Sequence, residues 1–554
     1  MQKQSFLDLF SSQAPAKREK PQTQMMALLG SDDPRAAVQA LGEVAFHDLV
    51  HGVGLHEAAD LMALASGEQV QACFDMDLWR KDSLNDDAMM PWLEAWLEIE
   101  DEDFVRLFYE IDPELIPLIL KRNVQVFASD DRNEEPVIPN EEQFIIRRSP
   151  DFVYWIAYPD NEEKAARLQA LVERLYVTLG VERAWSILEG MQWELETDLE
   201  ETAYRFRNTR MQALGFPTWE EAAAIYAQLD VESEAARLRR APVVALHVGE
   251  VEESRLFVDA LQEIDETSRG DTFLRRVLQR VQPISLFKSQ LLRLSNAVAV
   301  ADGWDAVNHE AFSVAMKEAM DRINVGLEYL SEKDEEFAAE LLKIIPIQRI
   351  FTFAFNLSLS LAKTLAPLLE RGLLSIIDDS PLSLLDDQQR DIVNGLLQEK
   401  PRPRYSTMDG FATLGDIEQS ALQIADLAFL ELFVYAVLKR SREDLARLAY
   451  ENDLIGGVES VSFDKLILTY LTRKYRNDAD LWAPFDESKY PSREELLAAV
   501  QVDNVQSMMS ETTNPTLEMS FIRLLARLER MVELQYPENI RKIEPEFVNL
   551  VLCV

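Results

Sequence analysis

Three of the five histidines of this 554-residue chain fall within one short stretch, at His47, His51 and His56. His47 and His51 stand four residues apart, so both imidazoles lie on one face of a helix, where such a pair can chelate a divalent metal ion. Gly52 and Gly54 should end that helix, which leaves His56 to point independently. We therefore predict that the three histidines do not converge on one point.

The residues around the histidines lack the other groups that metal chemistry uses. No glutamate stands between His47 and His51 as a water-activating base, which excludes the HExxH pattern. The His–Asp doublet of metal-dependent phosphohydrolases needs a further histidine upstream, and His47 is the first in the chain. We predict no metal, no cofactor and no catalytic residues, with His47, His51 and His56 as the candidates if a metal site exists.

Acidic side chains offer two other kinds of site. Asp75 and Asp77 suggest a calcium loop, but Arg80 occupies its sixth position, where glycine is required. We instead predict that Asp77 caps a helix and that Trp79 is a packing anchor. Two acidic helical stretches are candidates for a partner-binding surface, while solvated helix faces would look the same. Their residues are Glu98, Glu100, Asp101, Glu102 and Asp103, with Glu194, Glu196 and Asp198.

A basic, proline-held stretch, KPRPRY, covers residues 400 to 405. Its Arg402 and Arg404 are candidates for gripping a phosphate or a carboxylate, because guanidinium groups bind oxyanions in a bidentate way. Pairing of these arginines with acidic neighbours of the same chain is the alternative that we favour.

Charge and composition exclude several classes of function. Lys and Arg total 56 against 97 Asp and Glu, which gives a net charge of −41. Such a charge repels nucleic acids and anionic lipids and attracts basic protein segments. Cys73 and Cys553 are the only cysteines, which excludes a disulfide framework and fits a reducing cytoplasm. Phosphate-binding, dinucleotide-binding, nucleophile-elbow and kinase patterns are absent from the sequence.

Apolar residues recur at helical spacing along most of the chain, which predicts a mainly α-helical protein. Capping boxes at Ser66 with Gln69 and at Thr218 with Glu221 mark helix starts, and Asp112 before Pro113 marks another. Residues 345 to 372 form an apolar stretch that we predict to be a buried core helix, with no membrane insertion. β-branched and aromatic residues flank a turn over 143 to 159, which predicts a small β-hairpin near 143–158.

Short helical segments repeat at a spacing of 34 residues, which favours a helical-repeat, superhelical architecture. Breaks in composition predict the boundaries of the modules. They are a flexible tail at 1–24, an N-terminal helical-repeat module at 25–130, the hairpin with helices at 131–240, a central helical module containing the buried helix at 241–375, and a C-terminal helical module at 376–554.

Four stretches carry a resemblance to a known family: residues 54–84, 111–127, 214–230 and 543–552. Through them the chain resembles a bacterial domain-of-unknown-function family of full-length helical proteins. That resemblance implies a mainly helical fold along most of the chain and no particular activity, so it assigns a role to no residue.

These observations favour a non-catalytic, cytoplasmic helical scaffold or adaptor that binds another protein, itself basic, through its acidic surface. The alternative is a metal-dependent enzyme or divalent-cation sensor that uses clustered carboxylates with His47, His51 and His56. Metal content after purification distinguishes the two hypotheses.

Overall fold

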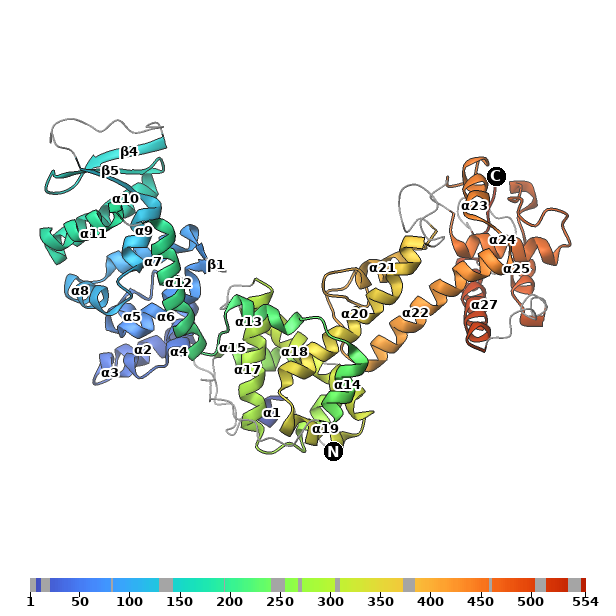
Figure 1. Cartoon of the computed structure of the whole chain (residues 1–554), viewed down its shortest axis with the longest axis horizontal. Coiled ribbons are helices and arrows are strands. Elements are labelled where there is room, and N and C mark those ends of the chain that lie inside the picture. Colours follow the sequence, from blue (N-terminus) through green and yellow to red (C-terminus); the bar gives the residue numbers. More distant parts are fainter. Residues whose placement is uncertain are drawn as a thin grey trace. The chain divides into compact units, whose positions relative to one another are not determined.

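The structure is a computed structural model that describes residues 6–10, 20–80, 83–128, 143–193, 195–240, 255–267, 272–303, 309–371, 384–457, 461–503, 515–536 and 550–554. The chain divides into two compact units. Figure 1 labels their helices and strands. The first unit contains Met1–Ala227, Arg237–Ile323 and Leu330–Thr352, and the second contains Gln228–Ala236, Asn324–Tyr329 and Phe353–Val554. Both units are mainly helical, as the sequence predicts.

Several helices of the first unit begin at residues whose side chains accept from free backbone amides. Ser66 and Thr218 each form the predicted capping box. The helices are α1 (Phe6–Phe10), α2 (Pro21–Leu29), α3 (Pro34–Gln39), α4 (Glu43–Val53), α5 (Ala59–Leu64), α6 (Gly67–Asp77), α7 (Asp86–Glu98), α8 (Asp101–Glu110), α9 (Leu115–Asn123), α10 (Glu162–Leu179), α11 (Val181–Trp193), α12 (Glu196–Ala213), α13 (Trp219–Ala223), α15 (Arg255–Thr267), α16 (Phe273–Leu278), α17 (Ile284–Ala301) and α19 (Glu335–Ile344).

Helices α14 (Val231–Arg239), α18 (His309–Ser331) and α20 (Ile347–Arg371) contribute residues to both units. The remaining helices belong to the second unit, and Ser441 and Ser492 close capping boxes at two of them. They are α21 (Asp387–Leu396), α22 (Leu414–Leu432), α23 (Arg442–Tyr450), α24 (Phe463–Tyr475), α25 (Arg493–Ala499) and α27 (Pro515–Gln535).

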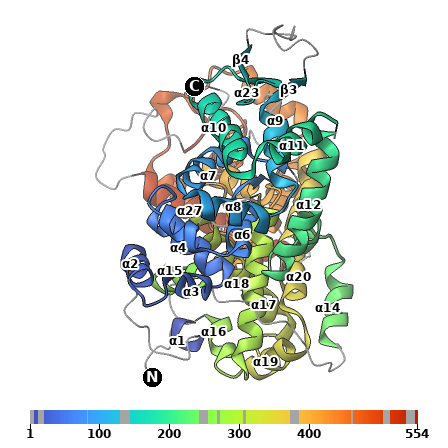
Figure 2. The ribbon, with the colours of Figure 1, turned by 90° about the vertical axis from the view of Figure 1, so that its left-hand side faces the viewer.

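The core of the first unit is one continuous apolar cluster that runs from α3 to α12. Phe46, Phe104 and Leu107 are fully buried in it, and Trp92 packs edge-on against Phe74. Trp79 is buried in the same cluster, which confirms the predicted packing anchor. Helices α4 and α6 lie side by side (Figure 2), and this pairing positions the candidate site described below.

The predicted β-hairpin is confirmed, and it belongs to a three-stranded antiparallel sheet. Strand β4 (Phe144–Arg148) pairs with β5 (Tyr154–Pro159), with Ile146 opposite Ala157. On its other edge β5 pairs with β3 (Gln125–Ala128), a strand that the sequence analysis missed. A second small hairpin joins β1 (Trp79–Arg80) to β2 (Ser83–Leu84).

Two predicted features near helix starts differ from the structure. Residues Phe6–Phe10 form α1, and Phe6 and Phe10 are buried against α15 and α17, where the sequence analysis expected a flexible tail. Helix α9 begins at Leu115, not at Pro113, because Asp112 caps a turn by accepting from the amide of Glu114 at 3.2 Å. At α1 the decisive contacts come from helices far along the chain, whereas the hydrogen bond at Asp112 is local.

The predicted core helix is α20. Among the described residues, it is the one helix with the length and apolar composition of a membrane span, over Ile347–Leu369. Phe351, Phe353 and Leu365 are fully buried within the protein, whereas Lys363 and Thr364 are exposed. The helix is therefore amphipathic, with its apolar side packed inside the chain.

Candidate metal centre

His47 and His51 lie on α4, which begins after Gly42 and ends at Gly54, where the backbone φ is +105°. Their spacing of one helical turn brings the ring centroids to 4.3 Å. The side chain of His47 is fully buried, whereas that of His51 is 41% exposed. The pair therefore extends from the core to the surface along one face of α4.

The third member of the cluster is Asp77, the last residue of α6. Its Oδ1 lies 2.8 Å from Nε2 of His47, and its Oδ2 lies 2.7 Å from Nε2 of His51. One ligand atom from each of the three residues lies within 4.8 Å of the other two. The predicted role of Asp77 as a helix cap is wrong, because the side chain turns across to α4.

The carboxylate of Asp77 is held by three side chains. Besides the imidazoles, the indole Nε1 of Trp92 on α7 donates to Oδ2 at 2.8 Å. Burial by itself would raise the pKa of Asp77, but the charge and hydrogen bonds of His47 and then His51 outweigh it and hold that pKa well below its usual range. An ionised carboxylate only accepts hydrogen bonds, so both imidazoles donate from Nε2.

His51 responds to the same carboxylate. Burial lowers its pKa, but the hydrogen bond and charge of Asp77, together with the charge of Asp48, more than offset that effect and raise the pKa above 6.5. The folded chain therefore favours the protonated form of His51 more than the unfolded chain does.

We expect a pH-dependent stability from this pair in the metal-free chain. Because the folded-state pKa of His51 is raised, the pair contributes fully below about pH 6.5, and the contribution is lost as the pH rises through the folded-state value. The His51→Gln protein should not show this loss of stability as the pH rises. Urea midpoints measured between about pH 5.5 and pH 8.5 would test it, and parallel curves for the two proteins would contradict it.

Cys73 lies one turn before Asp77 on α6 and is fully buried. Burial, followed by the charges of Asp77, Asp48 and Asp75, raises the pKa of its thiol well above the ordinary value. Because the thiolate is the form that binds metals, Cys73 is not suited to join the cluster as a ligand at neutral pH.

His56 lies apart from the cluster. Its side chain is 85% exposed, and its Nδ1 is 3.2 Å from Oε1 of Glu98. The structure thus brings two of the three candidate histidines together on one carboxylate and places the third on the surface with an acidic partner.

The first predicted acidic surface is partly neutralised by arginines of the same chain. Asp103 accepts from Arg35 at 2.8 Å and from Arg106 at 3.3 Å, and Asp101 lies 3.2 Å from Arg174. Glu100 and Glu102 are exposed, and neither forms an ion pair within the described part of the chain.

The second predicted acidic surface lies at the start of α12. Glu196 lies 3.8 Å from Arg122, and the nearby Glu200 accepts from the same guanidinium at 2.7 Å. Asp198 is exposed, and Glu194 lies outside the described residues.

The predicted anion-binding arginines lie in the loop between α21 and α22. Arg402 places Nη1 3.4 Å from the sulfur of Met408, and Arg404 is exposed. Over residues 384–457 and the other described segments, neither guanidinium forms an ion pair. The acidic neighbours that the sequence analysis favoured as their partners therefore do not bind them in this structure.

A buried ionic network beside the cluster escaped the sequence analysis. Asp75 is 1% exposed on α6, and Arg210 on α12 donates to both of its oxygens, at 2.6 and 3.0 Å. Arg210 also donates to Asp112 at 3.3 Å, and Gln71 donates to Asp75 at 2.8 Å. The network fixes α6 against α12 and so holds the end of α6 that carries Asp77.

The fold and the cluster together define a mainly helical protein with a candidate His–His–Asp metal centre. A family model matches residues 15–550, almost the whole length, and the chain belongs to that family, DUF6178, a family of unknown function. This confirms the resemblance to an uncharacterised family. Comparison with curated proteins gives no significant match, and neither does comparison with solved structures.

Proposed function

We propose that this protein binds a divalent transition-metal ion, of the zinc class, through His47, His51 and Asp77. The observation that carries the proposal is the convergence of two imidazole nitrogens and one carboxylate oxygen within 4.8 Å of one another. Imidazole ligands favour zinc and its neighbours over magnesium and calcium, which prefer oxygen ligands alone.

A bound zinc ion takes the place of the protons that Nε2 of His47 and Nε2 of His51 donate to Asp77. The nitrogen–oxygen distances of 2.7 and 2.8 Å are hydrogen-bond lengths. Around a tetrahedral zinc ion with bonds of about 2.0–2.1 Å, ligand atoms lie about 3.3 Å apart, so the cluster must open slightly. His51 provides the freedom for this, because its side chain reaches solvent, whereas His47 is fixed in the core.

The surroundings of Asp77 suit a metal ligand. The indole N–H of Trp92 donates to the carboxylate of Asp77 and orients it, as hydrogen-bond partners of metal ligands commonly do. Three protein ligands leave one tetrahedral position for a water molecule or a partner's side chain. The exposed edge of His51 is the side from which such a group approaches.

Zinc titration of the metal-free chain, followed by calorimetry, tests the proposal. We expect one zinc ion per chain, with release of protons as the imidazole Nε2 atoms become ligands. His51→Gln should weaken binding, while the control His56→Gln should not. Equal affinity for the native and His51→Gln proteins, or no binding, would exclude the site.

A separate observation supports a second proposal, that the acidic surface binds a basic cytoplasmic protein and that stacked helix pairs form a superhelical scaffold. The net charge is −41, and Glu100 and Glu102 at the start of α8 are exposed. The packing of α6 against α8 supports the stacking.

A lysine-rich peptide serves as a probe of this second proposal. We expect the affinity for the peptide to fall as the salt concentration rises. Changing both Glu100 and Glu102 to Gln should lower the association rate, with little change in the melting temperature of the protein. Matched substitutions at the exposed Glu162 of α10 and Glu182 of α11 serve as the control. An association rate that changes neither with salt concentration nor with the α8 substitutions would contradict the proposal.

A further inference from the structure

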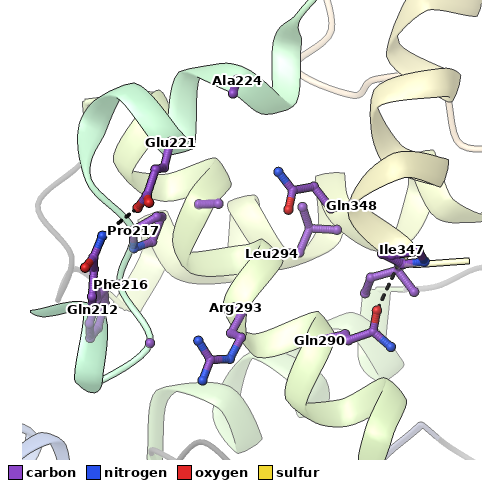
Figure 3. A pocket seen from close by; sticks show the side chains of 13 residues that line it. Gln212, Phe216, Pro217, Glu221, Ala224, Gln290, Arg293, Leu294, Ile347 and Gln348 are labelled. Carbon is purple, nitrogen blue, oxygen red and sulfur yellow. Dashed lines mark hydrogen bonds between the residues drawn. The ribbon is translucent and has the colours of Figure 1, made fainter. Parts of the chain in front are cut away.

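The first unit contains a cavity of about 680 Å³ that is separate from the histidine cluster. Helices α13 and α17, the segment before α13, and the start of α20 line it. Figure 3 shows Gln290 and Arg293 leaving α17 in different directions, Gln290 toward Ile347, with Gln212 and Glu221 on another side. Phe216, Leu294 and Ile347 supply apolar wall.

Two hydrogen-bond donors on one face of α17 lack partners at this cavity. Gln290 is 7% exposed, and its Oε1 accepts from the amide of Ile347 at 3.1 Å, yet its Nε2 has no hydrogen-bond partner. Arg293 follows three residues later on the same face, and its buried Nε has no partner either. A buried donor without an acceptor costs free energy, so a ligand that offers an acceptor here would be stabilised.

Arg293 lacks the carboxylate partner that several other arginines of the protein have. Arg210, Arg275 and Arg473 each donate to at least one carboxylate. Within the described ranges of the chain, Arg293 forms no ion pair, although acidic residues outnumber basic ones by 97 to 56. A guanidinium that is partly removed from water and lines a cavity can bind an oxyanion.

We infer that this cavity binds a small molecule with a carboxylate or phosphate group and an apolar body, with Arg293 donating hydrogen bonds to the oxyanion and the unpartnered amide of Gln290 available to the ligand. The apolar body packs against Phe216, Leu294 and Ile347. Nothing in this inference depends on the metal site.

Glu221 limits the charge that the other end of the ligand can carry. Its Oε2 accepts from Gln212 at 2.9 Å and from the amide of Thr218 at 3.1 Å, so it is held as part of the cavity wall. Hydrogen bonds from the Thr218 backbone and then from Gln212 lower the pKa of Glu221, which keeps it negatively charged. A second anionic group on the ligand is therefore disfavoured there, whereas a neutral or hydrogen-bond-donating end fits.

Three probes of similar shape test the inference in the full-length, metal-free protein: benzoate, phenyl phosphate and the neutral benzamide. Calorimetry should show binding of benzoate or phenyl phosphate at the cavity and much weaker binding of benzamide. The better of the two anions identifies the oxyanion class. Absence of binding by both anions at millimolar concentration would overturn the inference.

Substitutions locate the binding. Arg293→Gln should weaken the anionic probe by about 10- to 100-fold, the usual effect of losing a hydrogen bond from a charged donor. Gln290→Met, which keeps the side-chain length, should weaken it by a smaller factor, and it provides a second variant should the first fail to fold. Arg183→Gln is the matched control, because Arg183 is an exposed arginine of the first unit outside the cavity. Equal losses for Arg293→Gln and Arg183→Gln would refute the site.

Discussion

Replacing Asp75 by alanine is expected to lower the free energy of unfolding of the first unit by about 3 kcal/mol. The substitution removes the main partner of Arg210, which keeps only Asp112 at 3.3 Å, and leaves the amide of Gln71 without its acceptor. Breaking a buried ion pair from one side costs about 3–5 kcal/mol. The lower end applies because 34% of the Arg210 side chain still reaches solvent.

Urea unfolding followed by tryptophan fluorescence measures this loss. Trp482 is the only tryptophan of the second unit, so the signal reports mainly on the first. Asp198→Ala is the control, since Asp198 is exposed on α12 and should change stability by less than about 1 kcal/mol. If the free energies of unfolding of the Asp75→Ala and native proteins differ by less than about 1 kcal/mol, the network does not stabilise α6.

Changing Asp77 to asparagine is expected to weaken zinc binding by at least about 100-fold. The substitution keeps the size of the side chain but removes the only anionic ligand of the cluster. Losing a neighbour of a metal ligand already weakens binding by about 10- to 100-fold, so losing a ligand itself should cost more.

Competition with a chromophoric chelator gives the zinc affinities of the native and Asp77→Asn proteins. His56→Gln serves as the control, because His56 pairs with Glu98 outside the cluster. Near-equal affinities for native and Asp77→Asn proteins would place the zinc elsewhere, and circular dichroism establishes that the variant is folded.

Local patterns in the sequence predicted much of the fold. The capping boxes at Ser66 and Thr218 depend on residues three apart, and the hairpin of β4 and β5 depends on neighbouring β-branched and aromatic residues. Strand β3 was missed because its partner β5 begins 26 residues after β3 ends, and residues 129–142 between them carry no signal of pairing. Such a contact depends on packing more than on local propensity.

The same distinction explains the candidate site. Helical spacing places His47 and His51 on one face of α4, and the structure confirms that the two rings lie together. Asp77 is 26 residues beyond His51, and only the packing of α4 against α6 brings it to the two imidazoles. His56 lies apart from the pair because α4 ends before Gly54, as the two glycines of the sequence predicted. Phe6 and Phe10 stand one helical turn apart, but Asp8 between them and the polar residues that follow indicated a flexible tail.

The most direct test of the metal centre is the position of zinc in crystals of the zinc-loaded protein, located by anomalous scattering at the zinc absorption edge. We predict one ion within about 2.0–2.2 Å of Nε2 of His47, Nε2 of His51 and one carboxylate oxygen of Asp77. Zinc bound only at other residues, with the imidazoles of His47 and His51 still hydrogen-bonded to Asp77 at 2.8 and 2.7 Å, would contradict the proposal.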